Sequence, residues 1–356
     1  MQLAARGDGW MKRSSVQDEP TGASRPRIAL LGAVGALDLA AHLRAAGAEV
    51  LDGEPAPDAA SDPLAARYGY RHLSARTGDV GDLSVLVAIL RSAKTRTLPA
   101  DWIWQGADGR LLDGFRLSVD PDGFADANEL TLLREAHLGA LWAVLRDADD
   151  LILVLSDDGC LVDAQGGSRY PFVADVDARP PKGIKLTREF GEMARLNDDF
   201  VSFRALLADL NPRLQLRLAL LPAAIGPADF AARLPMLRQL SDLRVLMAHW
   251  AATMPGVSYL PVWEHCTGPL AQADQFFHAS GQVTADGGAA LARLCLGAPF
   301  VEPVATASLV AAIKEGPEDL AQKRARRAAR RAKRVDKAAG SASVICEEEL
   351  LEAFSR

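Results

Sequence analysis

Two patterns of apolar and polar residues alternate along this chain. Short continuous apolar runs predict buried strands, and longer stretches with an apolar residue every three or four positions predict amphipathic helices. Because strands and helices alternate, we expect an α/β fold, a three-layer sandwich in which helices cover both faces of a mainly parallel sheet. The predicted strands are Arg27–Leu31, Ala48–Leu51, Asp150–Leu155, Gln215–Leu221 and Val257–Pro261. The predicted helices are Leu37–Ala46, Asp79–Ala93, Asn128–Ala148, Asp198–Leu210, Pro235–Met254 and Ala285–Leu296.

Composition divides the chain into three parts. Residues 1–25 are polar and contain Gly, Ser and Pro, which predicts a flexible N-terminal segment. Residues 26–305 carry the strand and helix pattern and form the predicted α/β domain. Residues 306–356 form a tail in which residues 323–337 hold nine basic residues and one acid, among alanines that favour a helix. The formal net charge of −6 therefore combines an acidic body with a basic helical tail.

The basic stretch 323–337 is open to two interpretations. It has almost no large apolar residues, so it does not predict a helix that inserts into a membrane. Its charge alone can attract a polyanion such as nucleic acid, acidic polysaccharide or anionic headgroups. The alternative is a solvated helix that keeps the acidic body soluble or folds back on it.

The spacing of the cysteines and the length of the apolar runs limit the kinds of site and the cellular location that the sequence predicts. The four cysteines are widely spaced without a CxxC pair, which argues against a structural zinc site or a dense disulfide framework. We expect no resident metal or cofactor. The N-terminal residues show no apolar run of signal-peptide length, and no stretch is apolar for long enough to span a bilayer. A cytoplasmic protein without a transmembrane segment is the expectation.

Four segments carry motifs in a fixed order. They are Gly32-Ala33-Val34-Gly35-Ala36, Arg76-Thr77-Gly78-Asp79-Val80, Trp104–Phe124 and Val257–Glu264. In order and spacing they resemble the GSCFA family, a relative of the SGNH hydrolases, over residues 27–300. The resemblance implies an SGNH-like or flavodoxin-like sandwich. It also implies chemistry on acyl esters, by hydrolysis or acyl transfer, with a link to polysaccharide metabolism.

The resemblance places the nucleophile where this chain has an alanine. The family's serine would stand at Ala33, and an alanine cannot form a covalent acyl intermediate. Gly32 and Gly78 match glycines of the family's site, and Gly78 would serve the oxyanion hole. Asp79 replaces a neutral asparagine, and a carboxylate beside a developing oxyanion opposes catalysis. A local alternative is that Asp79 caps the helix that follows it.

Two further acids are candidate binding residues. Asp158 ends the run Ser156-Asp157-Asp158 after a buried strand, where paired acids can bind a metal or a cationic group or form a solvated turn. Glu264 matches the family's last motif and is a candidate pocket residue. The adjoining His265 and Cys266 could suggest a Cys/His nucleophile, but neighbours in an extended segment point to opposite sides.

One candidate base remains in the run Asp274-Gln275-Phe276-Phe277-His278. It resembles the Asp-x-x-His block of SGNH enzymes, with one residue more between the two. The resemblance implies that His278 is the base and that Asp274 orients it. Without that role, His278 is an ordinary loop histidine.

Three hypotheses of function follow. The first is a GSCFA-like domain that has lost its hydrolytic chemistry and binds a small-molecule or carbohydrate ligand, because Leu221 and Leu240 also replace polar family residues. The second is an active esterase or acyltransferase with a rearranged site. The third is a polyanion-binding protein that acts through residues 323–337.

Overall fold

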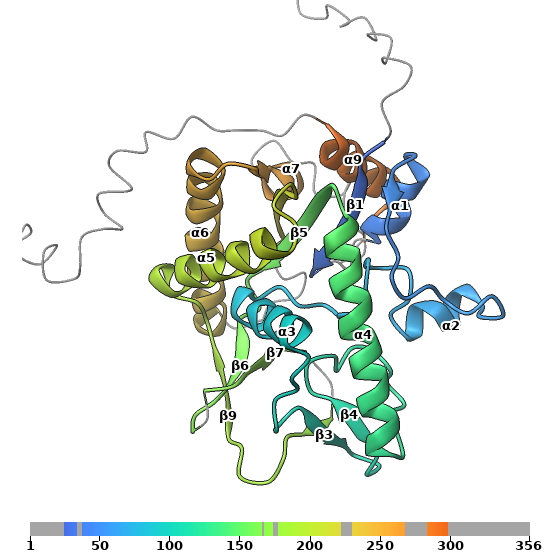
Figure 1. Cartoon of the computed structure of the whole chain (residues 1–356). Coiled ribbons are helices and arrows are strands. Elements are labelled where there is room, and N and C mark those ends of the chain that lie inside the picture. The colour runs from blue at the N-terminus through green and yellow to red at the C-terminus, as the bar shows by residue number, and fades with distance from the viewer. Residues whose placement is uncertain are drawn as a thin grey trace, which may run out of the picture.

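The centre of the protein is a parallel sheet of five strands (Figure 1). A computed structural model describes residues 25–33, 38–165, 167–173, 177–221, 230–267 and 283–297. The strands lie in the order β2-β1-β5-β10-β11, which is the order of flavodoxin-like sheets. Every strand pair in this sheet is parallel, so the α/β fold with a parallel sheet is confirmed. The bounds are β1 Arg27–Gly32, β2 Glu49–Val50, β5 Asp150–Ser156, β10 Gln215–Leu221 and β11 Val257–Leu260.

Alternate residues of the strands point into two separate cores. Ala29 and Leu31 of β1 pack in the first core, and Ile28 and Leu30 pack in the second. The central strand β5 is buried along its whole length, which fits its continuous apolar sequence. The helices of the first face are α3 Leu83–Thr95, α4 Ala127–Asp147, α5 Met193–Leu210 and α6 Phe230–Thr253. Those of the second face are α1 Leu39–Ala45, α7 Val262–Thr267 and α9 Ala285–Leu296.

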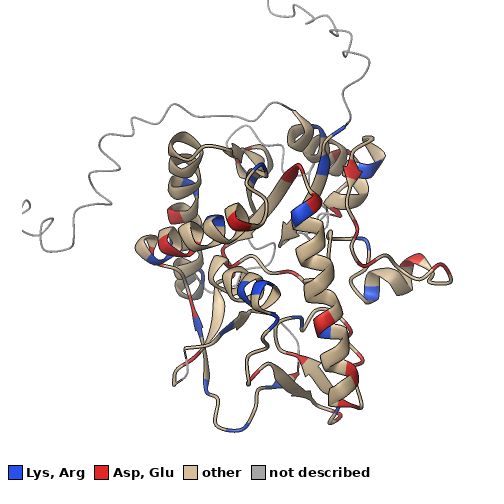
Figure 2. Cartoon of the chain, in the orientation of Figure 1, with Lys and Arg blue, Asp and Glu red and all other residues tan. Residues whose placement is uncertain are grey.

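Two small antiparallel sheets and a short helix decorate the sandwich. One sheet has the order β4-β3-β8 and the other β7-β6-β9. The strands are β3 Ile103–Gly106, β4 Leu111–Asp113, β6 Cys160–Asp163, β7 Arg169–Pro171, β8 Ala178–Arg179 and β9 Leu186–Glu189, and the helix is α2 Asp62–Arg67. Acidic and basic residues are interspersed over the described helices (Figure 2). No helix in the described part of the chain has the length and apolar composition that a membrane crossing requires.

The structure corrects two local predictions. Helix α3 begins at Leu83, because the carboxylate of Asp82 accepts hydrogen bonds from the peptide N–H groups of Ser84 and Val85. The prediction that Asp79 caps this helix is therefore wrong. The segment Glu264-His265-Cys266 lies within helix α7, so the expectation that it is extended is also wrong.

Three sequence predictions fall outside the described residues. They are the pair Asp274 and His278, the flexible segment 1–25 except for Arg25, and the basic stretch 323–337.

Candidate functional site

The turn after β1 lies against the central strand of the sheet. The peptide N–H of Ala33 donates to the carbonyl oxygen of Val154 over 3.0 Å. Gly32 has φ +111°, and a Cβ at that position would lie 1.9 Å from the same oxygen. Between β1 and β5 the chain order of the sheet reverses, and the crevice beyond this point is where open α/β sheets place ligands. Ala33 thus stands near the expected ligand edge.

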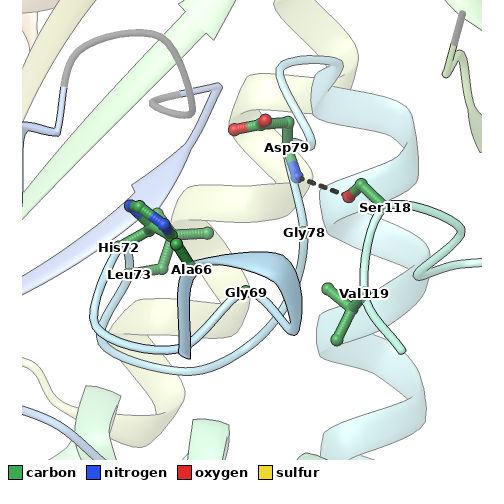
Figure 3. Close-up of a pocket in the computed structure, with 8 residues that line it drawn as sticks. All are labelled: Ala66, Gly69, His72, Leu73, Gly78, Asp79, Ser118 and Val119. Atoms are coloured by element: carbon green, nitrogen blue, oxygen red, sulfur yellow. Dashed lines mark hydrogen bonds between the residues drawn. The ribbon is translucent and has the colours of Figure 1, made fainter. Parts of the chain in front are cut away.

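A pocket of about 240 Å³ opens close to this edge (Figure 3). Its walls come from three segments, namely helix α2 with the residues after it, the loop before α3, and the loop after β4. Of the residues that the sequence marked, Gly78 and Asp79 line it. The full lining is Ala66, Gly69, His72, Leu73, Gly78, Asp79, Ser118 and Val119.

Several non-glycine residues with a positive φ lie around this pocket. Among the described residues, four that are not glycine have a positive φ. Asp38 at 44° contacts pocket residue His72, Arg71 at 69° precedes it, and Asp120 at 53° follows Val119 in the opposite wall. Such conformations cost about 1–3 kcal/mol each and concentrate at functional sites. Three of the four therefore mark this pocket as the candidate site.

Asp38 and His72 form an ion pair at the pocket. The Oδ1 atom of Asp38 lies 3.5 Å from Nδ1 of His72, whose side chain is 28% exposed. Asp38 stands at the N-cap position of α1, yet its side chain makes no capping hydrogen bond. The close contact with His72 lowers the pKa of Asp38, and the same contact raises the pKa of His72, with a further contribution from the charge of Asp79. The imidazolium form is thus stabilised by two carboxylates.

The opposite wall requires a glycine at position 78. Gly78 has φ +75°, and a Cβ there would lie 2.6 Å from Oγ of Ser118. The same hydroxyl oxygen accepts a hydrogen bond from the peptide N–H of Asp79 over 3.3 Å. The Asp79 side chain is exposed at the rim. The described pocket therefore has carboxylate, imidazole and hydroxyl groups beside the apolar Leu73 and Val119.

Asp158 lies at the same edge of the sheet but has its own partners. Its Oδ2 atom accepts a hydrogen bond from Oγ of Ser156 over 2.9 Å, and its carbonyl oxygen accepts one from Nε of Arg188 over 2.8 Å. The preceding Asp157 is only 3% exposed whereas the side chain of Asp158 is 37% exposed, so the prediction of a solvated pair is wrong for Asp157. Across the described ranges no group of three or more His, Cys, Asp or Glu side chains is placed to hold a metal ion.

Glu264 lies away from the pocket. It accepts hydrogen bonds from Nη2 of Arg244 over 2.7 Å and from the hydroxyl of Tyr259 over 2.6 Å. These residues lie on and beside β11, three strands from β1, which corresponds to about 14 Å across a sheet. The structure thus brings Gly32, Gly78, Asp79 and Asp158 to one edge and leaves Glu264 apart.

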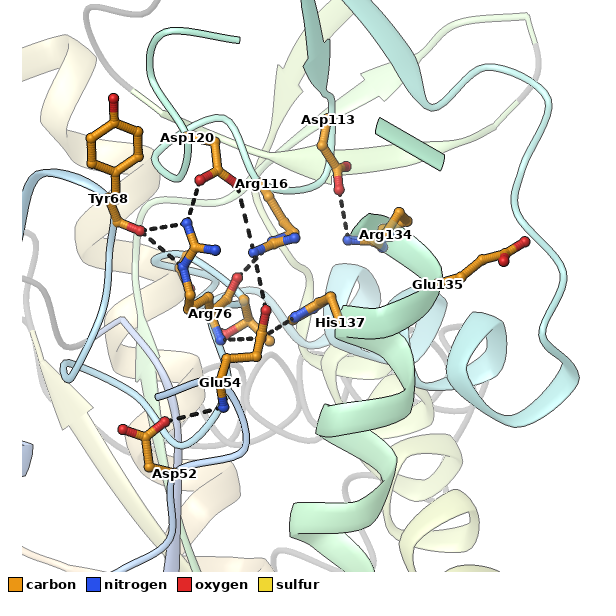
Figure 4. A network of polar contacts seen from close by, with 12 residues as sticks. Asp52, Glu54, Tyr68, Arg76, Asp113, Arg116, Asp120, Arg134, Glu135 and His137 are labelled. Atoms are coloured by element: carbon orange, nitrogen blue, oxygen red, sulfur yellow. Dashed lines mark hydrogen bonds and ion pairs between the residues drawn. The ribbon is translucent and has the colours of Figure 1, made fainter. Parts of the chain in front are cut away.

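Arg76 joins the three walls of the pocket (Figure 4). Its guanidinium group donates to the carbonyl oxygen of Tyr68, next to the wall residue Gly69. It also pairs with the carboxylate of Asp120, beside Val119. The residue itself lies two positions before Gly78. The Arg76 side chain therefore fixes the relative positions of the three segments.

A buried pair holds the backbone of Arg76 in place. Oε2 of Glu54 accepts hydrogen bonds from the peptide N–H of Arg76 over 2.7 Å and is 2.6 Å from Nδ1 of His137. Nε of Arg116 donates to the carbonyl oxygen of Arg76 over 2.6 Å. We call Glu54, Arg76, Arg116, Asp120 and His137 the clamp. It fixes both backbone polar groups of the residue that joins the walls.

The surroundings of His137 and Glu54 determine the protonation states of both side chains in the clamp. Burial, with the nearby positive charge of Arg116, lowers the pKa of His137 to about 4. Burial alone would raise the pKa of Glu54, but the hydrogen bond with His137 and the charges of His137 and Arg116 lower it to about 2. Near neutral pH the clamp therefore contains a neutral imidazole that donates to a carboxylate.

These values predict a loss of stability in mild acid. The unfolded chain protonates His137 below about pH 6.5, whereas the folded chain does so only below about pH 4. Stability is therefore lost as the pH falls through this window, by about 2 kcal/mol between pH 7 and pH 5 in urea unfolding. His137→Asn keeps a donor near the Nδ1 position without titrating, so most of this pH dependence should vanish. An unchanged slope in that variant would assign it to other groups.

Sequence patterns marked some of these residues and missed others. The Trp104–Phe124 segment included Arg116, and the residues of the family resemblance included Arg76. Asp38, His72 and Glu54 lie in segments without a motif, so no local pattern marked them. Their contacts join positions 34 residues apart for the first pair and 83 apart for Glu54 and His137.

Comparisons with protein-family models, with curated proteins and with solved structures find no match to this chain. The fold and the pocket define an α/β protein with a small site, lined by Asp79, His72 and Ser118 among apolar residues, near the carboxyl edge of a parallel sheet.

Proposed function

We propose that this chain is a divergent relative of the GSCFA and SGNH proteins that binds a small carbohydrate or acyl-ester ligand without serine chemistry. The observation that carries the proposal is the contact between Asp38, which has a positive φ, and His72, which lines the pocket. Strain marks a working site, and Ala33 removes the hydroxyl that a covalent mechanism needs. The activity is thus a binding or regulatory one.

The chemistry of the pocket favours a neutral ligand with hydroxyl groups. The carboxylate of Asp79 in the lining accepts hydrogen bonds and repels anions, so a phosphate or a free carboxylate is a poor ligand. Ser118 adds a hydroxyl oxygen. Leu73 and Val119 give an apolar surface that suits the C–H face of a sugar or a short acyl group.

The location of binding can be tested by filling the pocket. Ala66→Phe places an aromatic ring in the pocket wall without removing a polar group. Ala59→Phe adds the same ring at an exposed position that is not among the lining residues. In NMR titrations with methyl 6-O-acetyl-glucoside and methyl glucoside, we expect saturable shifts for the wild type and Ala59→Phe and none for Ala66→Phe. Equal binding by both variants would place the ligand elsewhere, and no binding by the wild type would reject the proposal.

A separate experiment tests whether any serine of this chain acts as a nucleophile. A fluorophosphonate probe labels activated serine nucleophiles, so we expect no covalent adduct on the full chain by intact-protein mass spectrometry. Stoichiometric labelling would show that another serine has taken over the role of the missing hydroxyl.

A further inference from the structure

We propose that two copies of this chain associate through the outer face of helix α6, with the two helices antiparallel and Ser241 at the two-fold axis. Within the described chain, none of the residues that line the pocket belongs to α6. The association is therefore a property of a different surface, and it goes beyond the proposed function.

Helix α6 has apolar residues on two opposite faces. Its inner face places Leu243 and Trp250 in the first core, where both are buried. Its outer face exposes Leu234, Leu237 and Val245, with exposed fractions of 54%, 44% and 38%. A helix at the surface of a protein ordinarily has polar residues opposite its buried stripe. The outer face of α6 is thus an apolar surface that the described chain leaves open.

The outer residues form one stripe along the helix. They follow one another at intervals of three or four positions, which is the spacing of a single helix face, and are Leu234, Leu237, Ser241, Val245 and Ala248. The other exposed large apolar side chains of the described chain are spread over helices α2, α4, α5 and α9. Scattered apolar residues are ordinary on a surface, whereas a continuous stripe is the kind of seam that pairs two helices.

The stripe is complementary to itself when the two helices are antiparallel. A two-fold axis at Ser241 sets each residue before this position against the residue equally far after it in the second copy. Leu237 then packs against Val245 of the partner subunit, and Leu234 packs against Ala248 of the partner subunit. Parallel helices would instead set leucine against leucine and alanine against alanine. Antiparallel pairing therefore joins larger with smaller side chains, and the small Ser241 at the axis allows a close approach of the helices.

The charges beside the stripe fit the same arrangement. Arg238 and Asp242 lie one turn apart on the same side of the stripe. In the antiparallel pair, Asp242 of the partner subunit lies two residues from the level of Arg238, which is about 3 Å along the axis. The symmetry makes this contact twice. On the other side of the stripe, Arg244 already pairs with Glu264 of its own chain. Charge complementarity thus favours a second copy of this chain as the occupant.

The mass of the full chain in solution tests the association. One pair of helices makes an interface in the small class, below about 1,200 Å², so we expect a reversible dimer in the micromolar range. In sedimentation equilibrium, the average mass should rise from 38.0 kDa toward twice this value as the concentration rises through that range. Leu237→Glu places a charge in the seam and should keep the chain monomeric. Leu132→Glu is the matched control, because Leu132 on α4 is 67% exposed, and it should match the wild type.

A charge exchange tests the antiparallel register. Arg238→Asp and Asp242→Arg each set like charges against each other across the axis, so each should weaken the dimer on the order of tenfold. The double variant that carries both substitutions restores opposite charges and should recover the affinity of the wild type. An unrecovered double variant would reject this register.

Cross-linking locates the two-fold axis. The cysteines that the structure describes are buried, and the remaining Cys346 is removed by a Cys346→Ser background. In this background a short bismaleimide should join two copies of Ser241→Cys into a covalent dimer. Leu234→Cys should stay uncrosslinked, because its two copies would lie about 21 Å apart along the axis.

Three outcomes would overturn the proposal. The first is a monomer at every concentration, which would mean that something other than a second copy covers the stripe. The second is equal loss of association in Leu132→Glu and Leu237→Glu, and the third is equal cross-linking of the two cysteine variants. Circular dichroism shows whether each variant folds. If Leu237→Glu does not fold, the charge exchange and the cross-links still decide the question.

Discussion

Glu54→Ala is expected to lower the free energy of unfolding by about 3–5 kcal/mol, which is the range for removing one partner of a buried ion pair. The reason is the number of groups that it leaves unsatisfied. The Arg116 guanidinium, the Nδ1 of His137 and the peptide N–H of Arg76 all face the Glu54 carboxylate, and all are buried. Removing the acceptor takes the hydrogen-bond partner from Nδ1 of His137 and from the peptide N–H of Arg76, and it takes the nearest carboxylate from Arg116. Urea unfolding at pH 7 measures the effect.

Two controls make this prediction specific. Asp209→Ala breaks the exposed Lys94–Asp209 pair and should change stability by less than about 1 kcal/mol. Glu54→Gln keeps a hydrogen-bond acceptor and removes the charge, so its loss should lie between the two alanine variants. Similar values for Glu54→Ala and Asp209→Ala would mean that the clamp does not stabilise the fold. Because the clamp sets the pocket walls, Glu54→Gln should also weaken ligand binding.

Gly32→Ala is expected to destabilise the protein by about 4 kcal/mol or more, an effect that single substitutions reach only through severe steric or polar mismatch. The new Cβ would lie 1.9 Å from the carbonyl oxygen of Val154, which belongs to the central strand β5. Relief would require β1 and β5 to move apart, and both strands are buried between the two cores from Ile28 and Asp150 onward. Differential scanning calorimetry or urea unfolding measures the loss.

Gly183→Ala is the matched control for this substitution. Gly183 has φ +100°, close to the +111° of Gly32, but a Cβ at position 183 would meet no atom within 4 Å. The loss of unfolding free energy in Gly183→Ala therefore measures only the backbone strain of an alanine with positive φ, about 1–2 kcal/mol. A difference of less than about 1 kcal/mol between the two variants would show that the sheet can adapt to a side chain at position 32.

The sandwich could be predicted from the sequence because its elements carry strong patterns. Strand Gln215–Leu221 and helix Ala285–Leu296 have the predicted bounds, and β5 extends one residue beyond its predicted end. The short helix Asp62–Arg67 was missed because only Ala65 on it is buried, so it has no apolar stripe to recognise. The start of α3 was placed too early because Asp79 and Asp82 are both plausible caps in sequence, and only the geometry selects Asp82.

The site was harder to predict than the fold. Gly78 and Asp79 were marked through the family resemblance and do line the pocket. His72 and Asp38 were not marked, because a contact between two loops leaves no periodic signal in either segment. Asp158 and Glu264 carry carboxylates in suitable sequence positions, yet each carboxylate forms an ion pair with an arginine. Such pairing depends on tertiary contacts that adjacent residues do not reveal.

Because the clamp joins residues that are far apart in the sequence, it affects the order in which parts of the protein fold. Apart from the Arg116–Asp120 pair, its contacts join residues 22 to 83 positions apart along the chain, and closing loops of this length is entropically costly until the surrounding structure is in place. The strands can associate before the clamp closes, but the three pocket walls cannot take their positions until it does. We expect a ligand of this pocket to bind the completed fold alone. Such a ligand would slow unfolding and protect the chain from proteases at concentrations near its dissociation constant.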